Sequence, residues 1–246
     1  MNVEYHKMWS QHLNKDMEFK SYGHAGKPVL VFPTGCGRFY EFEDFGMVEA
    51  VRDQIDGGRV TLYTVDSVDC ESWMAHWMPP GDRGERHLQY EHYILDELVP
   101  FVNDHSGYEG SLGTTGCSMG AYHAANFFFK HPDIFDTVIA LSGMYGPQHF
   151  VGDYMDDNVY FNFPLCYLPN LTDPWYIERF REAEIVICVG QGMWEEDSLR
   201  ETRLLEQDLH ALGVPAWVDI WGNNVSHDWP WWRKQWRYFL GELNLR

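Results

Sequence analysis

Residues 111–130 read SLGTTGCSMGAYHAANFFFK. The first five residues predict a short strand, and residues 121–130 predict a helix. Between them stands Gly116-Cys117-Ser118-Met119-Gly120, a serine with a glycine two positions away on each side. These glycines permit a sharp turn from strand to helix, because larger side chains would collide with one element or the other. The turn is therefore predicted to present the Ser118 hydroxyl at the tip of a sheet.

Strand-like and helix-like segments alternate along most of the chain. This alternation predicts an α/β fold, with a mostly parallel central sheet and helices on both faces. We expect one domain over residues 1–246, an antiparallel edge strand near 17–20, and an inserted loop around 146–175, where no clear period is present. The other strands are predicted at 29–32, 60–65, 137–141, 184–189 and 216–221, and the other helices at 43–55, 88–102, 197–212 and 231–243.

The composition narrows the range of partners. A formal charge of −19 repels nucleic acid and anionic membranes, so we expect neither as a partner. No apolar run is long enough to cross a bilayer, and the polar start of the chain lacks the apolar segment of a secretory signal. We therefore expect a cytoplasmic protein that acts on a small molecule, and the sequence leaves a homo-oligomer open.

Five cysteines stand at positions 36, 70, 117, 166 and 188, without a Cys-x-x-Cys pair. An odd number at these spacings indicates neither a disulfide framework nor a zinc knuckle. We therefore expect five reduced thiols, and neither a metal nor an organic cofactor is indicated.

Two blocks after the serine turn carry a family resemblance: His131-Pro132-Asp133-Ile134-Phe135 and Ile139-Ala140-Leu141-Ser142-Gly143. Together with the turn and its helix, they resemble the putative-esterase family. That family includes S-formylglutathione hydrolase (esterase D), feruloyl and enterochelin esterases and mycolyltransferases. The resemblance extends over residues 18–243, and it implies the α/β-hydrolase fold and a Ser-acid-His triad. It implies no particular substrate, because the chemistries of the family diverge.

Ser118 is predicted to be the nucleophile, with the positive end of the next helix aimed at the point where an oxyanion forms. The base must follow the last strand, because the order in this fold is serine, acid, histidine. Among 12 histidines, only His227 has that position. Imidazole is suited to moving a proton at neutral pH. His123, on the helix after the turn, is interpreted as structural.

The acid is expected just after the strand at 184–189, where Glu195, Glu196 and Asp197 follow one another. Glu195 is the first choice, because it comes three residues after Gly192, which resembles the family's glycine-to-acid step. Asp197 is the alternative, because many relatives use Asp here, although it could instead cap the next helix. The choice among the three carboxylates stays open at this point.

Two backbone amides are expected to form the oxyanion hole. One belongs to Met119, the residue after the nucleophile. The other is assigned to Cys36, with Gly37 as the alternative, in a loop that resembles the family's oxyanion loop. A thiol nucleophile at Cys36 or Cys117 is a rival interpretation, but neither thiol has a base nearby in the pattern.

Aromatic residues near these loops are predicted to line the substrate pocket, whereas Trp217, Trp232 and Trp236 are interpreted as core packing. The pocket candidates are Phe39, Tyr40, Trp73, Tyr145, Trp194 and Trp229.

These residues predict a serine hydrolase that cleaves a carboxylic ester through an acyl-enzyme intermediate. The alternatives are an acyltransferase with the same triad and a catalytically inactive binding protein of the same fold. The presence of both Ser118 and His227 argues against the binding protein, because binding needs neither residue.

Overall fold

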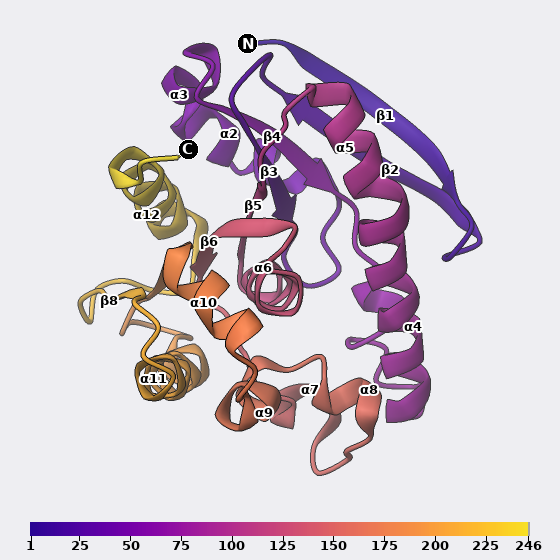
Figure 1. Cartoon of the computed structure of the whole chain (residues 1–246), viewed down its shortest axis with the longest axis vertical. Helices are drawn as coiled ribbons and strands as arrows, with labels where there is room; N and C mark the ends of the chain where they lie inside the picture. Colours follow the sequence, from indigo (N-terminus) through magenta and orange to yellow (C-terminus); the bar gives the residue numbers. More distant parts are fainter. Residues whose placement is uncertain (246) are drawn as a thin grey trace.

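The computed structural model describes residues 1–245, and one eight-stranded sheet runs through it (Figure 1). The strand order is β1-β2-β4-β3-β5-β6-β7-β8. The β1–β2 and β2–β4 pairs are antiparallel, and the other five pairs are parallel. The predicted mostly parallel sheet is therefore confirmed. The strands are β1 (Val3–Ser10), β2 (Lys15–Tyr22), β3 (Lys27–Phe32), β4 (Val60–Val65), β5 (Leu112–Cys117), β6 (Phe135–Leu141), β7 (Glu184–Val189) and β8 (Trp217–Ile220).

Helices cover both faces of the sheet. Val29 and Val31 of β3 belong to one hydrophobic core, and Leu30 and Phe32 belong to another, because successive side chains on a strand point to opposite faces. The first core includes residues from α1 (Glu41–Asp44), α2 (Met47–Ala50), α3 (Arg52–Asp56) and α12 (Trp229–Glu242). The second includes residues from α4 (Pro80–His92), η2 (Tyr93–Leu98), α5 (Val99–Ser106), α6 (Met119–Lys130), α10 (Pro174–Glu182) and α11 (Glu196–Ala211).

The N-terminal region differs from the prediction. The strand predicted near 17–20 is β2, but β1 pairs with it from Val3↔Tyr22 to Ser10↔Lys15, so β1 forms the edge. Most β1 residues are exposed or half-buried on both faces of the strand. Because neither face of β1 is a buried apolar face, its sequence does not alternate between apolar and polar residues. That alternation is the signal of a half-buried strand, so β1 could not be predicted from the sequence.

Two predicted helical regions also differ. The helix predicted at 43–55 is divided into α1, α2 and α3, and Gly46, with φ of 75°, separates the first two. The helix predicted at 88–102 extends over α4, η2 and α5, and η2 is a π-helical turn. Short helices give no detectable period in sequence.

The region predicted as an inserted loop at 146–175 holds short helices: α7 (Gln148–Val151), α8 (Asp157–Tyr160), α9 (Pro164–Tyr167), η3 (Leu168–Asn170) and the start of α10. It packs on α6, where the Tyr122 hydroxyl donates to the Asn162 carbonyl at 2.9 Å. Within the described residues, no helix is long and apolar enough to cross a membrane.

Candidate active site

Ser118 lies between the end of β5 and the start of α6. Its backbone has φ of 56° and ψ of −120°, a conformation that costs about 1–3 kcal/mol for a residue other than glycine. Both glycines of the motif are required by close packing. A Cβ on Gly116 would lie 2.4 Å from the Gly120 carbonyl carbon, and a Cβ on Gly120 would lie 2.2 Å from the Phe32 carbonyl oxygen. The strained turn leaves the Ser118 side chain half-buried at the carboxyl end of the sheet.

Glu195 and His227 are in direct contact. Nδ1 of His227 lies 3.0 Å from Oε2 of Glu195, whose side chain is 1% exposed, whereas that of His227 is 21% exposed. Within residues 1–245, no hydrogen bond joins the Ser118 hydroxyl to His227. Catalytic hydrogen bonds are often long or poorly aligned in the absence of substrate, so the missing bond does not rule out a catalytic pair.

A second set of contacts holds the far side of the Glu195 carboxylate. The Ser142 hydroxyl donates to Oε1 at 2.6 Å, and the Gly190 amide also donates to it at 3.3 Å. Ser142 in turn accepts a hydrogen bond from Nε1 of Trp232 at 3.0 Å. The Trp232 ring also meets the His227 ring edge-on, with centroids 4.9 Å apart. Sequence reasoning assigned no such role to Ser142, and it interpreted Trp232 as core packing alone.

The loops that carry Glu195 and His227 are joined by their backbones. Gly192 donates to the Val225 carbonyl at 2.7 Å, and His227 donates to the Met193 carbonyl at 3.0 Å. A Cβ on Gly190 would lie 2.1 Å from the same Val225 oxygen. The glycines before Glu195 are therefore needed for the two loops to approach, which is a physical reason for the spacing from Gly192 to Glu195 noted in the sequence.

The other two acid candidates lie outside this contact. Glu196 and Asp197 are exposed, and Asp197 forms an ion pair with Arg200 at 2.6 Å. The interpretation of Asp197 as a helix cap is wrong, because α11 begins at Glu196 and the capping position belongs to Glu195. Of the three carboxylates, Glu195 is the one that is buried and contacts His227, so it is the one that can orient the imidazole.

The loop after β3 approaches the serine turn at Gly35, where a Cβ would lie 3.8 Å from Cβ of Met119. The Glu41 carboxylate holds this loop by accepting from the Thr34 amide and the Thr34 hydroxyl, both at 2.8 Å. The Gly37 amide donates to the Thr34 carbonyl at 2.8 Å. Because that donor is used within the loop, Cys36 is the better candidate of the two for an oxyanion donor.

The prediction of five reduced thiols is wrong. A disulfide joins Cys36 to Cys70, with Cα atoms 5.2 Å apart, a normal separation for such a bond. Cys70 belongs to the short 3₁₀ helix η1 (Asp69–Glu71). The Asp69 carboxylate in this helix contacts Nε2 of the buried His123 at 2.7 Å, which fixes the helix against α6. Disulfides persist in oxidising surroundings, so the bond weighs against the expected cytoplasmic location.

Cys36 and Cys117, the two rival candidates for a thiol nucleophile, are both unsuited to that role. The Cys36 sulfur is in the disulfide. Cys117 is fully buried, and burial raises the pKa of its thiol well above the usual value, which disfavours the reactive thiolate.

The predicted pocket aromatics fall into three groups. Trp73 and Tyr145 are completely buried in hydrophobic clusters, so neither lines an open surface. Phe39 is 7% exposed, and Trp229 stacks on Phe45 with centroids 4.4 Å apart. Tyr40 and Trp194 are 42% and 75% exposed. Trp194 directly precedes Glu195, and most of its side chain is open to solvent.

Comparisons with known proteins identify a family and a shared fold. The family described as "Putative esterase" matches residues 10–238. No curated protein matches the sequence.

Three solved structures show how closely the fold is shared. A ferulic acid esterase has a TM-score of 0.75 at 16% identity, with 97% of this chain and 96% of that chain covered. The S-formylglutathione hydrolase of Agrobacterium tumefaciens has a TM-score of 0.73 at 15% identity, with 97% of this chain and 93% of that chain covered. MPT51 of Mycobacterium tuberculosis has a TM-score of 0.76 at 14% identity, with 100% of both chains covered. The α/β-hydrolase fold implied by the sequence is thereby confirmed.

Proposed function

Because the chain belongs to the family described as "Putative esterase", we propose that it is a serine hydrolase that cleaves carboxylic esters. Its triad is Ser118, His227 and Glu195. The observation that carries this proposal is the 3.0 Å contact between His227 and the buried Glu195 carboxylate, on loops at the same end of the sheet as the strained Ser118 turn. A buried carboxylate in this position fixes the imidazole tautomer and stabilises its protonated form.

The reaction proceeds in two steps. Ser118 Oγ attacks the acyl carbonyl while Nε2 of His227 takes its proton; the ester C–O bond breaks, and His227 returns the proton to the leaving alcohol. Water then attacks the acyl-enzyme with His227 as base, and Ser118 is released with the acid product. Nδ1 of His227 stays bound to Glu195 throughout.

The developing negative charge on the carbonyl oxygen is stabilised by the amides of Met119 and Cys36. Met119 is the first residue of α6, so its amide has no acceptor within that helix, and the positive end of the helix adds to the stabilisation. Cys36 has φ of 59°, and its disulfide restrains the loop that presents its amide. Rigid donors of this kind act without reorganisation when charge forms.

The proposal is tested with a fluorophosphonate probe and with nitrophenyl esters graded by acyl length. Wild-type protein should be labelled at Ser118, as located by peptide mass spectrometry, and should hydrolyse at least one ester of the series. Ser118→Ala should abolish labelling and lower turnover by roughly a thousandfold or more.

Ser111→Ala is the matched control, because Ser111 immediately precedes β5 at the end opposite Ser118. It should keep both labelling and turnover. A wild-type protein that neither reacts with the probe nor cleaves any ester would instead be a binding protein.

A further inference from the structure

Glu4, His6 and His105 form a cluster at the opposite edge of the sheet from the catalytic loops. One potential ligand atom from each residue lies within 4.8 Å of the other two. Glu4 and His6 occupy alternate positions on β1 and share one face of the strand. His105 belongs to the last turn of α5, which lies beside β1 and β2 in Figure 1. Segments far apart in the sequence thus bring a carboxylate and two imidazoles together.

The separation within the cluster fits ligands of one ion. Nε2 of His105 and Oε2 of Glu4 are 3.4 Å apart. Bonds of about 2.0–2.1 Å to a tetrahedral zinc ion place two ligand atoms about 3.4 Å from each other.

The two imidazoles are held by surrounding residues. Nδ1 of His105 lies 2.8 Å from the Tyr63 hydroxyl, and Nε2 of His6 lies 3.1 Å from the Ser21 hydroxyl. Histidines that bind metal usually make such a hydrogen bond through one ring nitrogen, which orients the ring. The His6 ring also stacks on Phe19, with centroids 4.9 Å apart. The cluster is therefore oriented before any ion binds.

The net charge of −19 also favours cations near the surface.

We propose that Glu4, His6 and His105 bind one divalent transition-metal ion of the zinc type, with water completing the coordination. Two imidazoles and one carboxylate suit Zn²⁺, whereas Mg²⁺ and Ca²⁺ prefer ligands that are all oxygen. The ion links the edge strand β1 to α5 and stabilises the fold. It takes no part in ester cleavage, because Ser118 lies on β5–α6, away from this edge.

The test uses the full chain after treatment with EDTA and desalting. Calorimetric titration with ZnCl₂ should show one ion per chain. A hundredfold excess of Zn²⁺ over its Kd should raise Tm by roughly 5–10 °C, and the same concentration of Mg²⁺ should not. His6→Ala and His105→Ala should each weaken Zn²⁺ binding by at least about tenfold.

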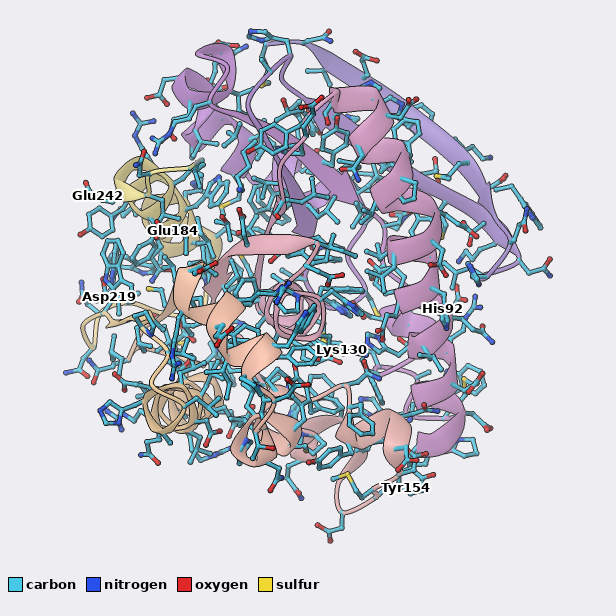
Figure 2. All side chains as sticks on the ribbon, in the orientation of Figure 1. His92, Lys130, Tyr154, Glu184, Asp219 and Glu242 are labelled. Carbon is cyan, nitrogen blue, oxygen red and sulfur yellow. A yellow bond between two sulfur atoms is a disulfide. The ribbon has the colours of Figure 1, made fainter. Side chains whose placement is uncertain are left out.

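His92→Ala is the control, because Figure 2 shows His92 on the outer side of α4, where it contacts Asp96 at 3.2 Å. This variant should bind Zn²⁺ like wild type. Glu4→Gln changes an exposed side chain and should also lose binding, so the test holds even where a histidine variant fails to fold. The proposal is overturned if wild type shows no stoichiometric Zn²⁺ binding, if Glu4→Gln binds normally, or if His92→Ala abolishes binding.

Discussion

The Ser142 hydroxyl donates to one oxygen of the Glu195 carboxylate at 2.6 Å, while the other oxygen contacts His227 at 3.0 Å. The carboxylate is therefore oriented from both sides. Ser142 has φ of 56°, directly after β6, so a second serine at this end of the sheet has a strained backbone. Strain of this kind concentrates where the surrounding structure must place a side chain accurately. Under the proposed function, Ser142 is a positioning residue that acts through Glu195.

Ser142→Ala should therefore lower kcat by about tenfold with little change in KM, because a hydrogen bond to a charged group is lost while the substrate contacts remain. In a Glu195→Gln background the same change should have little further effect, because the two residues act as a unit. Ser198→Ala is the matched control, since the Ser198 hydroxyl donates to the Ser142 carbonyl at 3.2 Å and, among residues 1–245, forms no hydrogen bond with Glu195. Additive losses in the double variant would contradict the positioning role.

Glu195→Gln preserves shape but removes the negative charge beside His227. We expect kcat to fall by roughly two to four powers of ten, as for other triad acids. Asp197→Asn should leave kcat nearly unchanged, because Asp197 is exposed and contacts only Arg200 among the ionised side chains described. Its effect on Tm should also be small, because exposed ion pairs contribute little. Ester kinetics that showed the reverse order would identify Asp197 as the acid.

The Cys36–Cys70 bond predicts three titratable thiols in denatured, unreduced protein, those of Cys117, Cys166 and Cys188, and five after reduction. Cys70→Ser should lower the free energy of unfolding by about 4 kcal/mol, because the bond closes a loop with a sequence separation of 34. It should also lower kcat several-fold, because the oxyanion loop loses a restraint. Cys166→Ser, which removes a free thiol, should change neither quantity. Five thiols before reduction would exclude the disulfide.

Glu91 should make stability depend on acid pH. Burial raises its pKa, but contacts with His131 and Lys130 outweigh burial and lower it from 4.5 to about 2. Because the native pKa is the lower one, Glu91 stabilises the fold above about pH 4.5 and loses this contribution as pH falls toward 2. The Tm difference between wild type and Glu91→Gln should therefore shrink between pH 6 and pH 3. Glu85→Gln, an exposed change on the same helix, is the control variant for these measurements.

Neighbouring residues were enough to predict much of the fold. The strand at 184–189 matches β7 residue for residue, and the turn from Gly116 to Gly120 has the conformation that its glycines indicate. Both depend on side chains close together in the chain: an apolar run in one case, and the absence of Cβ atoms in the other. The histidine loop could also be placed, because chain order after the last strand is a property of the fold.

Only the tertiary structure distinguished Glu195 from Asp197, joined Cys36 to Cys70, and placed Trp232 against Ser142. Each of these depends on segments that are distant in sequence and that approach when the sheet forms. Burial of one carboxylate among three adjacent ones follows from how closely Gly190 and Gly192 let the loop pack on Val225. Local composition does not contain that information, because the contact exists only after long-range packing has brought the loops together.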